Sequence, residues 1–342
     1  MDFLSKYFKY ENGLVVSGLT KELNIFYVLE LFKRENKNII ILTNTLFEAN
    51  RYYDSLHTYV DDVCLFPMDD FLTSVAVAIS PDLKIKRLET LEHIRNNKKT
   101  IVVTNLMGFL RYLPNKNDKS NLEFILKKRF SVKRDDILSI LDKFGYGRQS
   151  IVTTTGEYAV RGYIIDLFNI DDEHPIRIEF FGDEIDSIRS FDESSQLSIK
   201  EIDNFKIRPY TEVISDTYNS LVDYLNDPYT IMINKDQIDI AYDKLQLDIL
   251  EYNNNENISQ KHMYEMREIN YNYVIYLNEI SNNNSGKYLN YKSQEIENFN
   301  SDFELLGKYC QREIIAGKTI ILCLSKESQL KSLEPFLKSS CS

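Results

Sequence analysis

The turn between the first apolar run and the first helical stretch is the place where an α/β protein could bind a nucleotide. A phosphate-binding loop there reads GxxxxGK[ST], because glycines let backbone N–H groups surround the phosphates and the lysine reaches the terminal ones. This chain has "SGLTKEL" instead, with two residues between Gly18 and Lys21, and Glu22 directly after the lysine. The spacing predicts an ordinary strand-to-helix turn, and we expect no nucleotide or other cofactor.

The other residues that could perform chemistry are dispersed. "CLFPMDD" ends in the acidic pair Asp69 and Asp70, but Pro67 interrupts the strand before them. Without a phosphate loop, a magnesium ion would have nothing to bridge. The sequence contains no GxSxG motif, and its four cysteines and four histidines are scattered. We therefore expect no catalytic residue and no metal site, and we predict that this chain is not an enzyme.

One predicted strand carries residue types that are enriched where proteins bind each other. In the stretch "HPIRIEFFGDEIDSIRSFD", alternate residues share one apolar face: Ile176, Ile178 and Phe180. The opposite face carries Arg177, Glu179 and Phe181, before a hairpin turn at Gly182-Asp183. Arginine and aromatic side chains are enriched at protein interfaces. This pattern favours a partner-binding face, although the arginine could also pair with an acid of its own domain.

The composition limits the classes of protein that the chain can represent. A net charge of -11 argues against a surface dedicated to coating DNA, because duplex affinity comes mostly from neutralising phosphates. Scattered cysteines without a CxxC motif are typical of a reducing compartment, so we predict a cytoplasmic protein. No apolar run reaches the roughly 18 residues of a membrane span, and we expect no membrane partner. The last strand and helix pattern stops abruptly, so we expect a fragment of a longer protein.

The order of the predicted elements indicates an α/β fold interrupted by an α+β insert. Residues 1–121 read as the first half of an α/β domain with buried parallel strands. Residues 122–209 read as an antiparallel β unit with one short helix. Residues 210–342 return to alternating helices and strands, and we assign them to the second half of the α/β domain. A dense basic run, "LKKRFSVKRDD", lies where the insert begins, and we interpret it as a solvated helix start.

Individual elements follow from periodicity and from cap residues. We expect strands at 38–44, 100–105, 230–234, 273–279 and 319–325. We expect helices at 80–97, 134–144, 216–227, 235–252 and 301–317. Ser80 and Ser301 are the expected caps of two of these helices, and Gly145 is the expected end of another. The Asn-rich stretches 253–257 and 282–286 are expected to be loops.

The insert contains a long ordered series of motifs. They are Gly145-Tyr146, Val152, Gly156–Gly162, Asp166, Phe168, Pro175, Arg177, Asp183–Arg189, Phe191-Asp192 and Ser195-Gln196. This series resembles the domain shared by the bacterial transcription-repair coupling factors and the excision-repair protein UvrB. UvrB resembles a helicase with an intact phosphate loop, which the coupling factors have lost, so "SGLTKEL" favours the coupling factors. The resemblance implies that the α/β domain is a degenerate, helicase-like domain.

The resemblance also implies a partner and the residues that bind it. In this family the insert binds the damage sensor UvrA through two arginines and a phenylalanine, which correspond to Arg161, Arg177 and Phe181. RNA polymerase binding, ATP hydrolysis and translocation on double-stranded DNA belong to domains beyond residue 342. The chain has Tyr158 where phenylalanine is common, and Gly182 where aspartate is often found. Neither departure removes a contact residue.

Three alternatives remain open from the sequence. The chain could be part of an active UvrB-type ATP-dependent helicase, against which the missing phosphate loop argues. It could be an autonomous DNA-binding module, against which the acidic net charge argues. Within the insert, Arg161 and Arg177 could pair with the acids of the insert, such as Glu157 or Glu179, and Phe181 could pack on a neighbouring domain.

Overall fold

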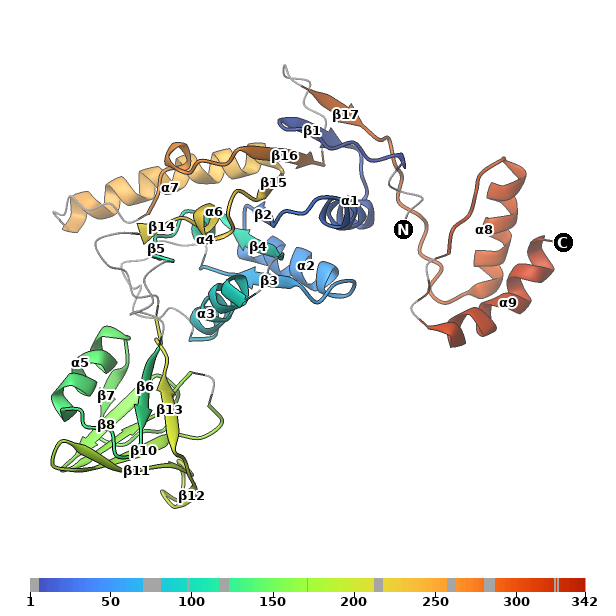
Figure 1. Cartoon of the computed structure of the whole chain (residues 1–342). Coiled ribbons are helices and arrows are strands. Elements are labelled where there is room, and N and C mark those ends of the chain that lie inside the picture. The colour runs from blue at the N-terminus through green and yellow to red at the C-terminus, as the bar shows by residue number, and fades with distance from the viewer. Residues whose placement is uncertain are drawn as a thin grey trace. The chain divides into compact units, whose positions relative to one another are not determined.

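The computed structural model describes residues 6–69, 81–96, 99–116, 123–170, 172–211, 218–256, 263–279, 287–322, 324 and 326–341 (Figure 1). It divides into two compact units, Met1–Lys292 and Ser293–Ser342. Within the described residues, no helix is long and apolar enough to cross a membrane.

The first unit contains a parallel sheet with the strand order β17-β1-β16-β15-β2-β4-β3. The strands are β1 (Leu14–Ser17), β2 (Ile39–Thr43), β3 (Val63–Phe66), β4 (Ile101–Asn105), β15 (Tyr229–Ile233), β16 (Tyr273–Asn278) and β17 (Tyr288–Asn290). Every residue of β2 and β4 is buried, as expected for central parallel strands that are covered on both faces.

Two hydrophobic cores lie on the two faces of this sheet. Ile39 and Ile41 of β2 belong to one core, and Ile40 and Leu42 belong to the other, because successive side chains of a strand point to opposite faces. The first core contains residues of α1 (Lys21–Arg34) and α2 (Leu46–His57). The second core contains residues of α3 (Pro81–Asn96), α4 (Leu106–Phe109), α6 (Leu221–Tyr224) and α7 (Lys235–Glu256). Smaller elements are β5 (Leu113–Pro114), β14 (Tyr218–Asn219) and the 3-10 turn Met266–Glu268.

The middle of the chain forms a separate sheet with the strand order β12-β11-β10-β9-β8-β7, in which β7 and β8 pair in parallel and the other neighbours are antiparallel. The strands are β7 (Gly147–Gln149), β8 (Glu157–Arg161), β9 (Ile164–Leu167), β10 (Ile176–Phe181), β11 (Glu184–Phe191) and β12 (Ser198–Glu201). A second pair joins β6 (Phe124–Lys127) to β13 (Asn204–Ile207). The predicted α/β fold with an α+β insert is therefore confirmed. The insert boundaries at residues 122 and 209 stay predictions.

Helix α5 (Arg134–Lys143) covers one face of the antiparallel sheet. Ile137 and Leu141 of α5 are fully buried in the same core as Ile178 and Phe180 of β10. The helix ends as predicted at Gly145, whose φ of 82° is a conformation that other residues rarely adopt. This packing fixes which face of the sheet is internal, and so leaves the opposite face for the polar residues.

The second unit, Ser293–Ser342, contains α8 (Phe303–Ile315) and α9 (Glu327–Cys341), which pack on each other. The sequence assigned these residues to the α/β domain, whereas the structure places them in a unit of their own. The expected strand at 319–325 is wrong for its described residues, which form no strand. A strand needs a neighbour for its backbone hydrogen bonds, and an apolar run cannot supply one by itself.

Some local predictions also need correction. Asp302, not Ser301, caps α8, and its carboxylate accepts hydrogen bonds from two backbone N–H groups. In the expected helix at 216–227, only Leu221–Tyr224 is helical among the described residues, because Tyr218–Asn219 pairs with β5. Asn253 to Glu256 form the end of α7 rather than a loop. Ser80, Asp70 and residues 282–286 lie outside the described residues.

Candidate functional site

Strand β10 presents its side chains as the alternation predicted. Phe180 is 7% exposed and belongs to the insert core, whereas its neighbour Phe181 is 83% exposed. Phe181 ends the strand, and Gly182 follows with a φ of 64° in the turn to β11. Two adjacent phenylalanines thus have opposite environments, and the outer ring has no apolar cover in the described part of the chain.

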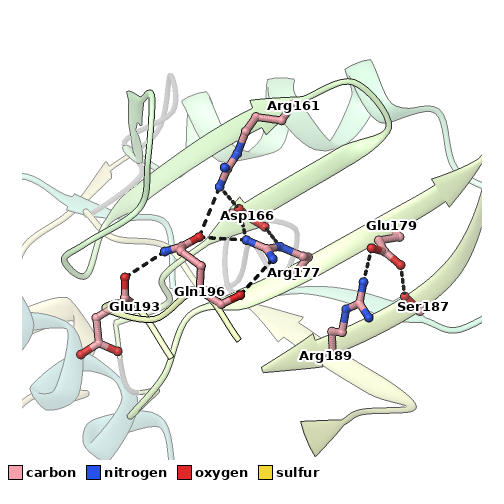
Figure 2. A network of polar contacts seen from close by, with 8 residues as sticks. All are labelled: Arg161, Asp166, Arg177, Glu179, Ser187, Arg189, Glu193 and Gln196. Carbon is pink, nitrogen blue, oxygen red and sulfur yellow. Dashed lines mark hydrogen bonds and ion pairs between the residues drawn. The ribbon is translucent and has the colours of Figure 1, made fainter. Parts of the chain in front are cut away.

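Four residues behind Phe181, the same strand carries a buried ion pair (Figure 2). Arg177 lies opposite Asp166 of β9 in the strand register. Its Nε is 2.7 Å from Oδ1 of Asp166, and its Nη2 is 2.9 Å from Oδ2. Asp166 is only 1% exposed, so this carboxylate depends on protein donors rather than on water.

Arg161 binds the same carboxylate from the other side. Its Nη2 lies 2.8 Å from Oδ2 of Asp166, at the end of β8. The side chain of Arg161 is 47% exposed, whereas that of Arg177 is 15% exposed. The structure therefore brings the two predicted arginines together, but it corrects the expectation that both are surface residues.

Gln196 joins both arginines, as Figure 2 shows. Its side-chain oxygen accepts from Nη2 of Arg177 at 3.0 Å, and from Nη2 of Arg161 at 3.4 Å. Its amide group donates to the backbone oxygen of Glu193 at 2.8 Å, which orients the oxygen toward the arginines. Sequence reasoning gave no role to Asp166 or Gln196. Both residues belong to the motif series, but the pattern did not indicate what their side chains bind.

The guanidinium group of Arg177 is held on a third side by an aromatic ring. It lies 4.4 Å from the centroid of the buried Phe191 ring, a cation–π contact. Hydrogen bonding to Asp166 raises the pKa of Arg177 above its usual value, and this effect outweighs the lowering by burial. Arg177 is therefore a rigid cation, and its position is determined mainly by its own domain.

The acids that we considered as alternative partners have other roles. Glu179 binds Arg189 and accepts from the hydroxyl of Ser187 at 2.9 Å. Glu157 accepts from the backbone N–H groups of Thr153 at 2.8 Å and Thr154 at 3.0 Å. The alternative was correct that the arginines pair within the insert, but wrong about which acid they bind. The sequence named Glu157 and Glu179 only as examples of acids in the insert, whereas strand register selects Asp166.

Phe181 is not part of this network. It lies four residues from Arg177, which corresponds to about 13 Å along an extended strand. The structure thus separates the three predicted site residues into a partly buried arginine, a half-exposed arginine and an exposed aromatic ring at the end of the hairpin.

The turn between β1 and α1 is closely packed at its glycine, Gly18. Gly18 has a φ of 69°, and a side chain there would collide with the side chain of Asn290 and approach the backbone nitrogen of Lys292 to 2.8 Å. Residues of the same chain therefore occupy the space beside this turn. Thr20 caps α1 by accepting a hydrogen bond from the backbone of Leu23.

A cavity of about 260 Å³ lies between α1 and α2. Burial raises the pKa of Glu48 in its wall above the usual value, and nearby Glu279 raises it further. The wall combines Lys21 and Arg51 with these acids, so its charge favours no single class of ligand. Among the described residues, no group of three or more His, Cys, Asp or Glu side chains could hold a metal ion.

The segment that holds the arginines and Phe181 also has recognisable relatives. Residues 124–212 match the family model of the UvrB interaction domain. The matched segment contains Arg161, Asp166, Arg177, Phe181 and Gln196. The resemblance that the motifs indicated is therefore confirmed.

Longer matches connect the chain to transcription-repair-coupling factors. The protein of Bacillus subtilis (strain 168) is 31% identical over 202 residues, which are 58% of this chain and 17% of that protein. The protein of Staphylococcus aureus (strain bovine RF122 / ET3-1) is 32% identical over 213 residues, or 62% of this chain and 18% of that protein. The chain thus matches less than a fifth of the length of these relatives.

Proposed function

We propose that this chain is the UvrA-recruiting part of a transcription-repair coupling factor. In this proposal, the UvrB interaction domain at residues 124–212 binds UvrA and so links a stalled RNA polymerase to nucleotide excision repair. The family match supports the domain assignment, and the similarity to transcription-repair-coupling factors supports the coupling role. RNA polymerase and double-stranded DNA would be bound by domains outside this chain.

The observation that carries the proposal is the pair of exposed groups that this domain offers a partner: the ordered, half-exposed guanidinium of Arg161 and the exposed ring of Phe181. Among the described residues, Arg161 binds Asp166 and Gln196 through Nη2, which leaves Nε and Nη1 of the half-exposed side chain for a carboxylate of a partner. Arg177 uses its donors on Asp166 and Gln196, so it positions the shared acid rather than acting as the main contact. Phe181 supplies apolar area that a partner can bury.

The proposal includes no nucleotide cofactor and no catalytic step for this chain. The β1–α1 turn lacks the GxxxxGK[ST] spacing of a phosphate loop, and the side chain of Asn290 packs against its Gly18. This supports an interaction role over the alternative of an active helicase fragment.

The test is a biosensor affinity measurement with purified UvrA, on wild type and on variants at three positions. Phe181→Ala and Arg161→Ala should each weaken binding by about thirtyfold, which is the usual scale of an interface hot spot. Lys200→Ala on the exposed strand β12 is the matched control and should bind like wild type. Absence of UvrA binding by wild type, or equal binding by all the variants, would contradict the proposal.

A further inference from the structure

Asp166, Gln196 and the two arginines form a closed ring of hydrogen bonds (Figure 2). Nη2 of Arg161 donates to Oδ2 of Asp166 at 2.8 Å and to the side-chain oxygen of Gln196 at 3.4 Å. Nη2 of Arg177 donates to the same two oxygens at 2.9 Å and 3.0 Å. An Nη group of arginine carries two hydrogens, so the ring uses both hydrogens of each Nη2. The two acceptors therefore keep two positively charged groups next to each other.

The two acceptors of this ring are supported in different ways. Asp166 is 1% exposed and lies on β9 directly opposite Arg177, so the sheet itself positions it. Gln196 follows β11 and has a φ of 61°, a conformation that residues other than glycine rarely adopt. Its backbone N–H donates to the carbonyl of Asp192 at 2.8 Å, and its side-chain amide donates to the carbonyl of Glu193 at 2.8 Å. The turn thus holds Gln196 in an unusual backbone conformation, in which its oxygen closes the ring.

Arg161 is the member of the ring that depends most on Gln196. Arg177 also has the two-point contact with Asp166 and the aromatic ring of Phe191. The described residues give Arg161 one other hydrogen bond, to Asp166 through the same Nη2, and 47% of its side chain is exposed. Without the oxygen of Gln196, the two guanidinium groups would repel each other beside Asp166. Arg161 would then move, because it is the more exposed of the two.

Gln196 supplies this acceptor without adding a negative charge. The two arginines carry two positive charges and Asp166 carries one negative charge, so the ring retains one positive charge. Gln196→Glu would remove it. Asp192, which accepts two hydrogen bonds within its own turn, and Glu193 reduce any long-range attraction. The positive charge therefore acts on groups within hydrogen-bond reach of Arg161.

We propose that Gln196 is a positioning residue for the binding of UvrA. This inference rests on the proposed function, because Gln196 acts through Arg161, one of the proposed contacts. Its oxygen holds Arg161 in the ring before the partner arrives, so that binding does not have to order this long side chain. Its lack of charge leaves the ring one positive charge for a carboxylate of the partner. Gln196 itself needs no contact with UvrA.

The test measures association and dissociation rates of purified UvrA on the immobilised full chain. Gln196→Met keeps the length and the unbranched β-carbon of the side chain but removes the acceptor. It should weaken binding about fivefold, on the scale of ordering one long side chain. Gln196→Glu keeps an acceptor but neutralises the ring, and should weaken binding about tenfold, chiefly through faster dissociation. Gln237→Met and Gln237→Glu make the same changes at an exposed position of α7 and should stay within about twofold of wild type.

A double-mutant cycle with Arg161→Ala distinguishes positioning from a direct contact or a merely structural role. In the Arg161→Ala background, Gln196→Met should weaken binding by less than about twofold, because the side chain that it positions is absent. A role independent of Arg161 would cost about fivefold in both backgrounds. Such additivity would overturn the inference.

The outcomes separate the inference from the function on which it rests. If Arg161→Ala and Phe181→Ala weaken UvrA binding but both Gln196 variants bind like the Gln237 variants, the inference is wrong and the proposed function stands. If wild type does not bind UvrA, both fail. Thermal melts verify that each variant is folded. Gln196→Asn, which tolerates positive φ and is one methylene shorter, replaces Gln196→Met if the latter does not fold.

Discussion

Asp166 and Arg177 form a two-point ion pair between adjacent strands, and the acid is almost completely enclosed. The two contacts are 2.7 and 2.9 Å long, and strand register places the residues directly opposite each other. Two parallel N–H···O bonds give such a pair both strength and a fixed orientation. The pair therefore contributes to the stability of the domain as well as to the geometry of the proposed site.

Arg177→Ala should destabilise the insert by about 2–3 kcal/mol, because it removes the main partner of a buried carboxylate and leaves Arg161 to compensate in part. Arg189→Ala is the matched control, since Arg189 lies opposite Arg177 in the neighbouring strand and pairs with the more accessible Glu179. Its loss should cost at most about 1 kcal/mol. Urea denaturation of both variants measures the difference. Equal losses in the free energy of unfolding would show that the enclosed Asp166–Arg177 pair stabilises the domain no more than the accessible Glu179–Arg189 pair.

The neighbouring phenylalanines should respond in opposite ways to truncation. Phe180→Ala should cost about 3–5 kcal/mol of stability, because it empties a place in the core. Phe181→Ala should stay within about 0.5 kcal/mol of wild type, because its ring is exposed. Thermal unfolding decides this, and an early melt of Phe181→Ala would mean that its ring is covered in solution.

Two glycines with positive φ allow strain to be separated from collision. Gly162→Ala should cost about 1 kcal/mol from backbone strain alone, because in the described residues, apart from its two chain neighbours, no atom lies within 4 Å of the added carbon. Gly18→Ala should cost clearly more, since the added carbon also collides with Asn290. Chemical denaturation of both variants is the measurement. A Gly18→Ala variant as stable as Gly162→Ala would show that the β1–α1 turn is open.

Glu157 should make part of the stability of the domain dependent on pH. Burial alone would raise the pKa of Glu157, but hydrogen bonds from Thr153 and Thr154 outweigh it and lower the pKa below the usual 4.5. A lowered pKa in the folded state stabilises the fold above the unfolded value, and this contribution is lost as pH falls through the folded value. Glu157→Gln should therefore be less stable than wild type at pH 7, and this difference in the free energy of unfolding, the stability gap, should shrink as the pH falls. A gap that is constant from pH 7 to pH 3 would contradict this.

Duplex DNA should bind weakly to the isolated chain. The net charge of -11 gives little long-range attraction, and at physiological salt exposed charges are screened beyond about 8 Å. Fluorescence anisotropy across a salt series should show binding that is mostly lost at physiological ionic strength. Tight binding that persists there would point to a basic surface large enough to overcome the net charge.

The sequence by itself determined the features that depend on local periodicity. Strand alternation has a period of two residues, so it predicted that Phe180 is inside and Phe181 outside without knowledge of any neighbour. The same holds for the buried side of α5 and its end at Gly145, which follow from helical spacing and from the freedom of glycine to adopt positive φ. The ordered motifs also indicated the family to which the insert is similar.

Tertiary structure alone decided the features that depend on which segments meet. Asp166 became the partner of both arginines through strand register, and Glu157 and Glu179, which seemed equally suitable in the sequence, were bound elsewhere. The apolar run at 319–325 did not become a strand in its described residues, because a strand requires a neighbour that the run does not encode.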